Sequence, residues 1–112
     1  MNIIIAGGGK VGITLVRLLS AEGHDLTLVD LNQKTLESIV EQHDIIAVGG
    51  NCASMGVLLE AGIKEADLLI AVTGQDELNL LSCMTAHGLN PKLHTIARIR
   101  NPEYTDQIHS MR

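Results

Sequence analysis

The chain has 112 residues, of which 46% are hydrophobic and 19% are charged, and its formal net charge is −5. This length predicts one domain over residues 1–112, and this composition excludes an intrinsically disordered chain. The eight lysines and arginines are scattered singly, and no apolar run approaches the roughly 20 residues of a membrane-spanning helix, so neither nucleic acid binding nor direct membrane insertion is expected.

The N-terminus and the cysteines favour a cytoplasmic protein. The first residues lack the charged, apolar and small-residue segments of a secretory signal. Cys52 and Cys83 show no metal-ligand spacing, and we expect no disulfide between them. The histidines also show no metal spacing, and we assign none of them a role.

The first half of the chain alternates short apolar runs with helical periodicities. Residues 2–6 are an isoleucine-rich run, typical of a strand buried on both faces. The elements expected next are a helix that ends at Gly23, a strand over 26–29 that ends at Asp30, a helix capped by Asn32, and a strand over 45–48. The residues expected on the buried stripes of the two helices are Val11, Leu15, Leu18 and Leu19, and then Leu36, Ile39, Val40 and His43.

The same alternation continues to the end of the chain. Ser54 is predicted to cap a short helix that stops at Gly62, and the most hydrophobic strand candidate follows over 67–72. Asp76 is predicted to cap a helix that carries Leu78, Leu81 and Met84 and stops at Gly88. A fifth strand is expected over 93–99, and Asn101 and Pro102 begin a last helix.

Strands that alternate with helices at this spacing predict a parallel sheet covered on both faces. The expected fold is a Rossmann-like, doubly wound α/β sheet with strand order 3-2-1-4-5. Two complete mononucleotide-binding halves have a sixth strand, so we expect the chain to be a fragment of a longer protein.

The glycines at the first strand-to-helix turn point to a nucleotide. Gly7, Gly9 and Gly12 stand in GxGxxG register, where the first permits a tight turn, the second lets a pyrophosphate approach, and the third lets the helix pack on the strand. The helix that begins near Lys10 directs its free N–H groups and positive dipole end to this spot. Asp30, at the end of the second strand, can accept both ribose hydroxyls. The alternative is that the glycines serve only close packing.

Asp30 also predicts which dinucleotide binds. A 2′-phosphate about 4 Å from its carboxylate meets a repulsion of roughly 4 kcal/mol per charge pair at an effective dielectric constant of 20. No arginine follows at Leu31 or Asn32 to offset this repulsion. NADP is therefore disfavoured against NAD(H) or an adenine nucleotide.

The strand order places further residues at the same crevice. Ligands of such folds lie where strands 1 and 4 diverge, which brings Thr73 and Gly74 opposite Gly7 and Gly9. Asp76 and Asn79 are close enough in sequence to reach a ribose or a bound water, although Asp76 has the alternative role of capping its helix.

Four side chains have two possible roles each. Lys10 either contacts a phosphate or is solvated in the first helical turn. Arg98 and Arg100 share a face at the carboxyl end of the fifth strand, where they bind phosphate or a partner, or are solvated. Cys52, beside Asn51 on the adenine side, is favoured as a small apolar neighbour over a reactive thiol, because no cation or histidine lies nearby in sequence.

Several segments together resemble a known family. The segments IIIAGGGKVG, LVD, GNCAS, ADLLIAVTGQDELN and IARIRNPEY, spread over essentially the whole chain, are similar to the N-terminal nucleotide-binding domain of Trk-type potassium-uptake regulatory subunits, the RCK/KTN (TrkA-N) family. The resemblance implies a cytoplasmic Rossmann lobe that binds NAD(H) or ATP/ADP. It also implies assembly into homodimers or higher homo-oligomers, and a membrane potassium-translocating subunit as the partner at the inner face of the cell membrane.

The resemblance also implies ligand contacts and a longer chain. The implied contacts are Gly7, Gly9, Lys10, Val11, Asp30, Leu31, Asn51, Cys52, Thr73, Gly74, Glu77 and Arg98. Many relatives carry an aspartate where Asn51 stands, and an amide there can still bond a ribose or a base. Relatives continue into a sixth strand and a second lobe, so this chain resembles their truncated first lobe.

Two other classes of function compete with a ligand-sensing regulatory domain. An NAD-dependent oxidoreductase needs a proton-relay residue beside the nicotinamide, and Tyr104, the only tyrosine, is followed four positions later by Ile108 rather than by lysine. A passive oligomerisation lobe needs no nucleotide site, and the intact Gly7, Gly9, Gly12 and Asp30 set argues against it. We therefore expect a regulatory domain and not an enzyme.

Overall fold

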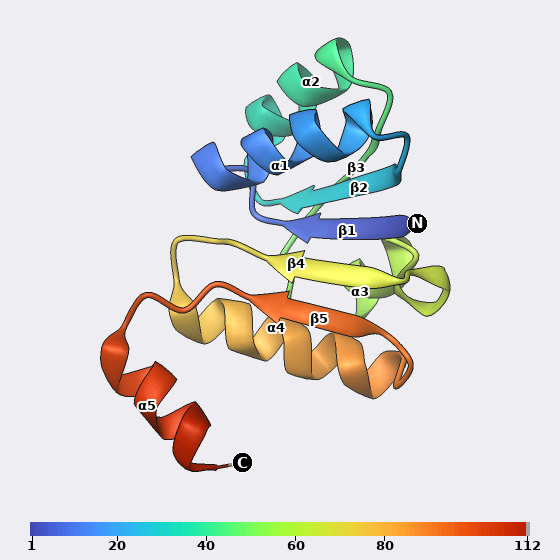
Figure 1. Ribbon diagram of the computed structural model, residues 1–112. Helices are drawn as coiled ribbons and strands as arrows, with labels where there is room; N and C mark the ends of the chain where they lie inside the picture. The colour runs from blue at the N-terminus through green and yellow to red at the C-terminus, as the bar shows by residue number, and fades with distance from the viewer. Residues whose placement is uncertain (112) are drawn as a thin grey trace.

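The structure, a computed structural model, describes residues 1–111 and shows a five-stranded parallel sheet (Figure 1). The strand order is β3-β2-β1-β4-β5, which confirms the predicted doubly wound fold. The strands are β1 (Asn2–Ala6), β2 (Asp25–Asp30), β3 (Ile46–Gly49), β4 (Leu68–Ala71) and β5 (His94–Ala97). The helices are α1 (Lys10–Ala21), α2 (Gln33–Gln42), α3 (Met55–Glu60), the 3-10 turn η1 (Ile63–Glu65), α4 (Asp76–Leu89) and α5 (Pro102–Ser110).

Helices cover both faces of the sheet, and each face has its own hydrophobic core. Successive strand residues point to opposite faces, so Ile3 and Ile5 of β1 pack under α1 and α2 with Leu28 of β2. Ile4 and Ala6 pack on the other face, toward α3 and α4. Because both faces of β1 are buried, its sequence reads as a continuous apolar run, as predicted.

The predicted helix caps are confirmed where short polar side chains begin a helix. Asn32 accepts a hydrogen bond from the N–H of Thr35 (3.2 Å). Ser54 accepts one from Val57 (3.5 Å), and Asn101 accepts one from Glu103 (3.0 Å), with Pro102 in the first turn. These caps are local, and this explains why the sequence predicts them correctly.

The buried face of α4 differs from the prediction. Leu81 and Met84 are 52% and 70% exposed, whereas Ser82, Cys83 and Ala86 face the sheet. Two stripes of this helix have helical spacing, and the stripe of smaller residues packs inward. The helix also continues through Gly88 to Leu89, so the predicted stop is wrong.

In α1 and α2 the predicted stripes are too wide. Val11 and Leu18 of α1 are 39% and 60% exposed, and Val40 of α2 is 43% exposed. The buried residues are Gly12 and Val16 in α1 and Leu36 and Ile39 in α2. Each helix therefore lies on the sheet along a narrow strip.

The last helix stands apart from the sheet. α5 begins beside the start of α4 and projects away from the strands (Figure 1). None of its residues is buried, so packing does little to fix its direction.

Candidate functional site

Two adjoining pockets lie at the carboxyl ends of the strands, where β1 and β4 diverge. Gly7, Asp30 and Thr73 line both of them. The first, here called the apolar pocket, is also lined by Val29, Leu31, Gly50, Asn51, Cys52 and Leu78. The second, here called the cationic pocket, is also lined by Gly8, Gly9, Lys10, Val11, Val72, Gly74, Arg98 and Arg100. The strand order predicts this position for a ligand.

The glycine loop between β1 and α1 has the packing that its sequence predicts. Gly7 has a φ of +115°, a conformation that favours glycine, and a Cβ there would lie 2.9 Å from the main-chain nitrogen of Thr73. A Cβ at Gly12 would overlap the carbonyl oxygen of Gly7, so the helix approaches the strand as closely as backbones allow. Gly9 differs, because nothing lies within 4 Å of a Cβ built there.

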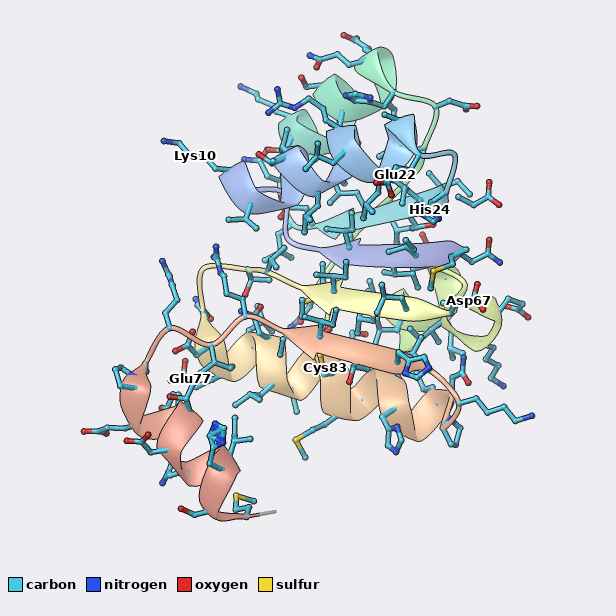
Figure 2. The ribbon with its side chains drawn as sticks, viewed as in Figure 1. Lys10, Glu22, His24, Asp67, Glu77 and Cys83 are labelled. Atoms are coloured by element: carbon cyan, nitrogen blue, oxygen red, sulfur yellow. The ribbon has the colours of Figure 1, made fainter. Side chains whose placement is uncertain are left out.

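The start of α1 is open toward the cationic pocket. Gly9 is the N-cap residue and makes no side-chain cap hydrogen bond. The first N–H groups of a helix have no intrahelical partner and carry partial positive charge. Gly9, Lys10 and Val11 therefore present donors suited to an anion. Lys10 itself extends outward from this first turn (Figure 2).

Gly8 lines the cationic pocket, although the GxGxxG register leaves it unassigned. Its N–H donates a hydrogen bond to Oδ1 of Asp30 (2.9 Å). A Cβ at Gly8 would lie 2.8 Å from Cγ2 of Thr35 and 3.3 Å from Cγ of Asp30, so a side chain there would force the side chain of Thr35 to move. The glycine between Gly7 and Gly9 in the sequence is the signal for this close approach.

Asp30 has a structural role in addition to its predicted one. Its Oδ1 binds the glycine loop through Gly8, and its Oδ2 accepts the N–H of Asn32 (2.9 Å). A carboxylate offers about four acceptor positions, so two remain for other donors. Asp30 is half-buried at the junction of the two pockets.

Asn79 was predicted to reach a ligand or water, and the structure places it elsewhere. The side chain is completely buried. Its Oδ1 accepts from the N–H (2.8 Å) and the hydroxyl (2.6 Å) of Thr73, and its Nδ2 donates to the carbonyls of Thr73 (3.2 Å) and Arg98 (2.8 Å). All its bonds go to the protein. Asn79 therefore joins the ends of β4 and β5 below the pockets.

The two arginines after β5 are both in the cationic pocket. Nη2 of Arg98 donates to the carbonyl of Thr73 (2.9 Å), and Nη2 of Arg100 donates to the carbonyl of Gly74 (2.8 Å). Nε of Arg98 is buried and has no hydrogen-bond partner among residues 1–111. A guanidinium has five N–H donors, so both arginines keep donors for an anion.

Asp76 and Glu77 lie outside the lining of both pockets. The helix cap is Gln75, and Asp76 instead accepts the N–H groups of Arg100 (3.0 Å) and Asn101 (2.8 Å). Glu77 accepts the hydroxyl of Tyr104 (2.7 Å). The bonds from the two N–H groups hold the pKa of Asp76 below its ordinary value. The Tyr104 bond lowers the pKa of Glu77 and raises that of Tyr104.

These carboxylates predict sensitivity to acid. Because their pKa values are lowered in the folded state, their contribution to stability is present above the ordinary carboxylate pKa and is lost as the pH falls below about 4. We expect the Asp76→Asn and Glu77→Gln double variant to lose less thermal stability between pH 5 and pH 3 than the wild type. The control is Asp106→Asn, on the exposed α5 surface. Equal acid sensitivity of wild type and double variant would contradict the prediction.

The cysteines are free, as predicted, and Asn51 lines the apolar pocket. Cys52 and Cys83 are free and buried. Burial raises the pKa of Cys52 and raises that of Cys83 to about 11, so both thiols are protonated near neutral pH. Cys52 is thus an apolar neighbour in the apolar pocket. Asn51 is exposed at its mouth and accepts the N–H of Ala53 (2.8 Å).

The family model of the TrkA-N domain matches residues 3–112. The chain belongs to the TrkA-N domain family. It is 45% identical over 104 residues to the Trk system potassium uptake protein TrkA of Haemophilus influenzae, covering 93% of this chain and 23% of that relative. The chain thus spans about a quarter of that relative's length.

Two solved structures that resemble this TrkA-N domain are complexes with a nucleotide. One is the Kef CTD of Shewanella denitrificans in an AMP-bound form, with a TM-score of 0.85 and 28% sequence identity. The match covers 99% of this chain and 67% of the Kef CTD chain. The other is the GsuK channel bound to NAD, with a TM-score of 0.83 and 25% sequence identity. The match covers 97% of this chain and 20% of the GsuK chain.

Within residues 1–111, no helix combines the length and the apolar character needed to cross a membrane. The same residues contain no cluster of three or more histidine, cysteine, aspartate or glutamate side chains placed to hold a metal ion.

Proposed function

We propose that this TrkA-N domain binds NAD(H) or ATP/ADP across the two pockets and regulates a membrane potassium transporter or channel. The apolar pocket suits an adenine ring, and the cationic pocket suits its phosphates. The observation that carries the proposal is the open start of α1 facing Arg98 and Arg100. Backbone donors and guanidinium groups thus converge on one anion position.

The relatives support the regulatory half of the proposal. The Haemophilus relative is named as a potassium uptake protein, and a structural neighbour is a channel bound to NAD. By this likeness, the domain acts in the cytoplasm, at the inner face of the membrane, through a potassium-translocating partner. It acts as a homodimer or higher homo-oligomer and not as an enzyme. Tyr104 bonds Glu77 outside both pockets, so it offers no proton relay to a bound nicotinamide.

Thermal unfolding with NAD⁺, NADH, ATP, ADP and NADP⁺ tests ligand binding. A ligand at 100 times its dissociation constant stabilises the folded state by about 2.7 kcal/mol. We expect stabilisation by NAD(H) or by ATP/ADP, and less by NADP⁺ at equal concentration. Absence of any shift would favour the passive oligomerisation lobe. Hydride transfer to a panel of carbonyl compounds would favour the oxidoreductase.

Asp30→Ala tests whether the carboxylate of Asp30 contacts the ribose of the bound nucleotide. We expect NAD⁺ affinity to fall more than NADP⁺ affinity, because the variant loses the acceptor for the ribose hydroxyls and also the repulsion against a 2′-phosphate. Both affinities also fall in part because Gly8 and Asn32 lose their acceptor. The measurement is therefore the ratio of the two affinities by calorimetry. The control is Asp30→Asn, which keeps one acceptor oxygen without charge. An unchanged ratio would mean that Asp30 does not contact the ribose.

A further inference from the structure

Three side chains, those of Asp76, Glu77 and Tyr104, attach the segment that leads into α5, and the start of α5 itself, to the first turn of α4. Asp76 accepts two successive N–H groups, those of Arg100 and Asn101, and Glu77 accepts the hydroxyl of Tyr104. Asn101 in turn caps α5. We call Asp76, Glu77, Asn101 and Tyr104 the latch. Figure 2 shows Glu77 between the starts of α4 and α5.

The direction of α5 depends on the latch. All nine residues of α5 lie outside the buried core, and the helix projects away from the sheet (Figure 1). An element with little buried surface is held weakly and opens locally at low cost. The hydrogen bonds at its first turn are therefore its main restraint.

The same segment contributes two side chains to the cationic pocket. Arg98 and Arg100 line the pocket with the glycine loop, and their guanidinium groups donate one hydrogen bond each, to the carbonyls of Thr73 and Gly74. Nε of Arg98 is buried without a partner in the described chain, residues 1–111. An anion bound between the glycine loop and these guanidinium groups adds bonds that hold the segment to the sheet.

We propose that a nucleotide in the cationic pocket restrains α5 through Arg98, Arg100 and the latch, so that α5 reports whether the site is occupied. The inference rests on the proposed nucleotide binding. A ligand shifts the population of α5 arrangements only by the difference in its affinity for them. Contacts to Arg98 and Arg100 provide that difference, because the N–H of Arg100 bonds Asp76 and Arg100 directly precedes Asn101 of the latch in the chain.

Hydrogen exchange of the 112-residue chain, with ADP and NAD⁺ as probes, tests the inference beside calorimetry of the same samples. We expect saturating nucleotide to slow amide exchange in α5 about fivefold or more, which is the size of a typical coupling between sites. Exchange over 63–67, at the opposite end of the sheet, should stay unchanged. Binding without slowing in α5 overturns the inference and leaves the proposed function intact. If neither ADP nor NAD⁺ binds, both the inference and the proposed nucleotide binding are overturned.

Variants locate the coupling in the latch. In Asp76→Ala, nucleotide affinity should stay within about tenfold of wild type while the slowing in α5 is lost, since Arg100 then no longer fixes the start of the helix. Asp106→Asn, which removes one charge from α5 itself, should keep the slowing. Tyr104→Phe removes a single hydroxyl, should at least halve the slowing, and replaces Asp76→Ala if that variant does not fold. Full slowing in the latch variants overturns the inference.

Discussion

Gly12→Ala is expected to lower the free energy of unfolding by about 3 kcal/mol, at the upper end of the usual cost of overpacking. The new Cβ would overlap the carbonyl oxygen of Gly7, which is backbone and has no rotamer to move. Relief requires α1 to shift from β1, which disturbs the core residues Val16 and Ile5. For a domain of this size the loss corresponds to a fall in Tm of roughly 12 °C.

Gly9→Ala is the matched variant in the same loop. No atom lies within 4 Å of its added Cβ, and the φ of −78° suits alanine, so thermal stability should change little. The methyl group instead occupies space beside the open start of α1, where the phosphates are proposed to lie. We expect Gly9→Ala to keep its Tm and to lose at least tenfold in ADP or NAD⁺ affinity. Equal Tm values for the two variants would contradict the packing argument.

Asn79→Ala is expected to destabilise the fold by about 3 kcal/mol, because buried polar groups without partners each cost roughly 1–3 kcal/mol. The variant removes Oδ1, which accepts two hydrogen bonds from Thr73, and Nδ2, which donates to the carbonyls of Thr73 and Arg98. The measurement is the midpoint of urea unfolding at constant m-value. Since Thr73 lines both pockets, nucleotide affinity should fall as well.

Ser82→Ala is the control for this variant. Ser82 is also completely buried on α4, and its hydroxyl donates one bond, to the carbonyl of Cys52 (2.8 Å). One lost bond costs roughly 1 kcal/mol, about a third of the effect expected at Asn79. If Asn79→Ala destabilises the domain no more than Ser82→Ala does, the junction between β4 and β5 does not depend on the amide.

Much of the candidate site follows from the sequence, because its position is a consequence of topology. Parallel strands in the order 3-2-1-4-5 bring Gly7, Asp30 and Thr73 to one end of the sheet whatever the details of packing. The glycine register predicts the close approach at Gly12 for a similar reason, since a strand, a tight turn and a helix leave no room there.

The partners of individual polar side chains do not follow from the sequence in the same way. Asp76 binds the backbone 24 and 25 residues away, and Glu77 binds a hydroxyl 27 residues away. Local rules predict a cap or a ligand contact for such residues, because they consider only the nearest turn. Asn79 was misassigned for the same reason.

The sequence by itself determined the alternation of strands and helices with its strand order, the helix caps at Asn32, Ser54 and Asn101, and the glycine turn, since each depends on hydrophobic period, connection rules or residues within one turn. Only the tertiary structure decided that Ser82 and Cys83 rather than Leu81 and Met84 face the sheet, and that Asp30 binds Gly8. Helical periodicity defines stripes but not which stripe faces inward, and a hydrogen bond between distant residues exists only once the fold has brought them together.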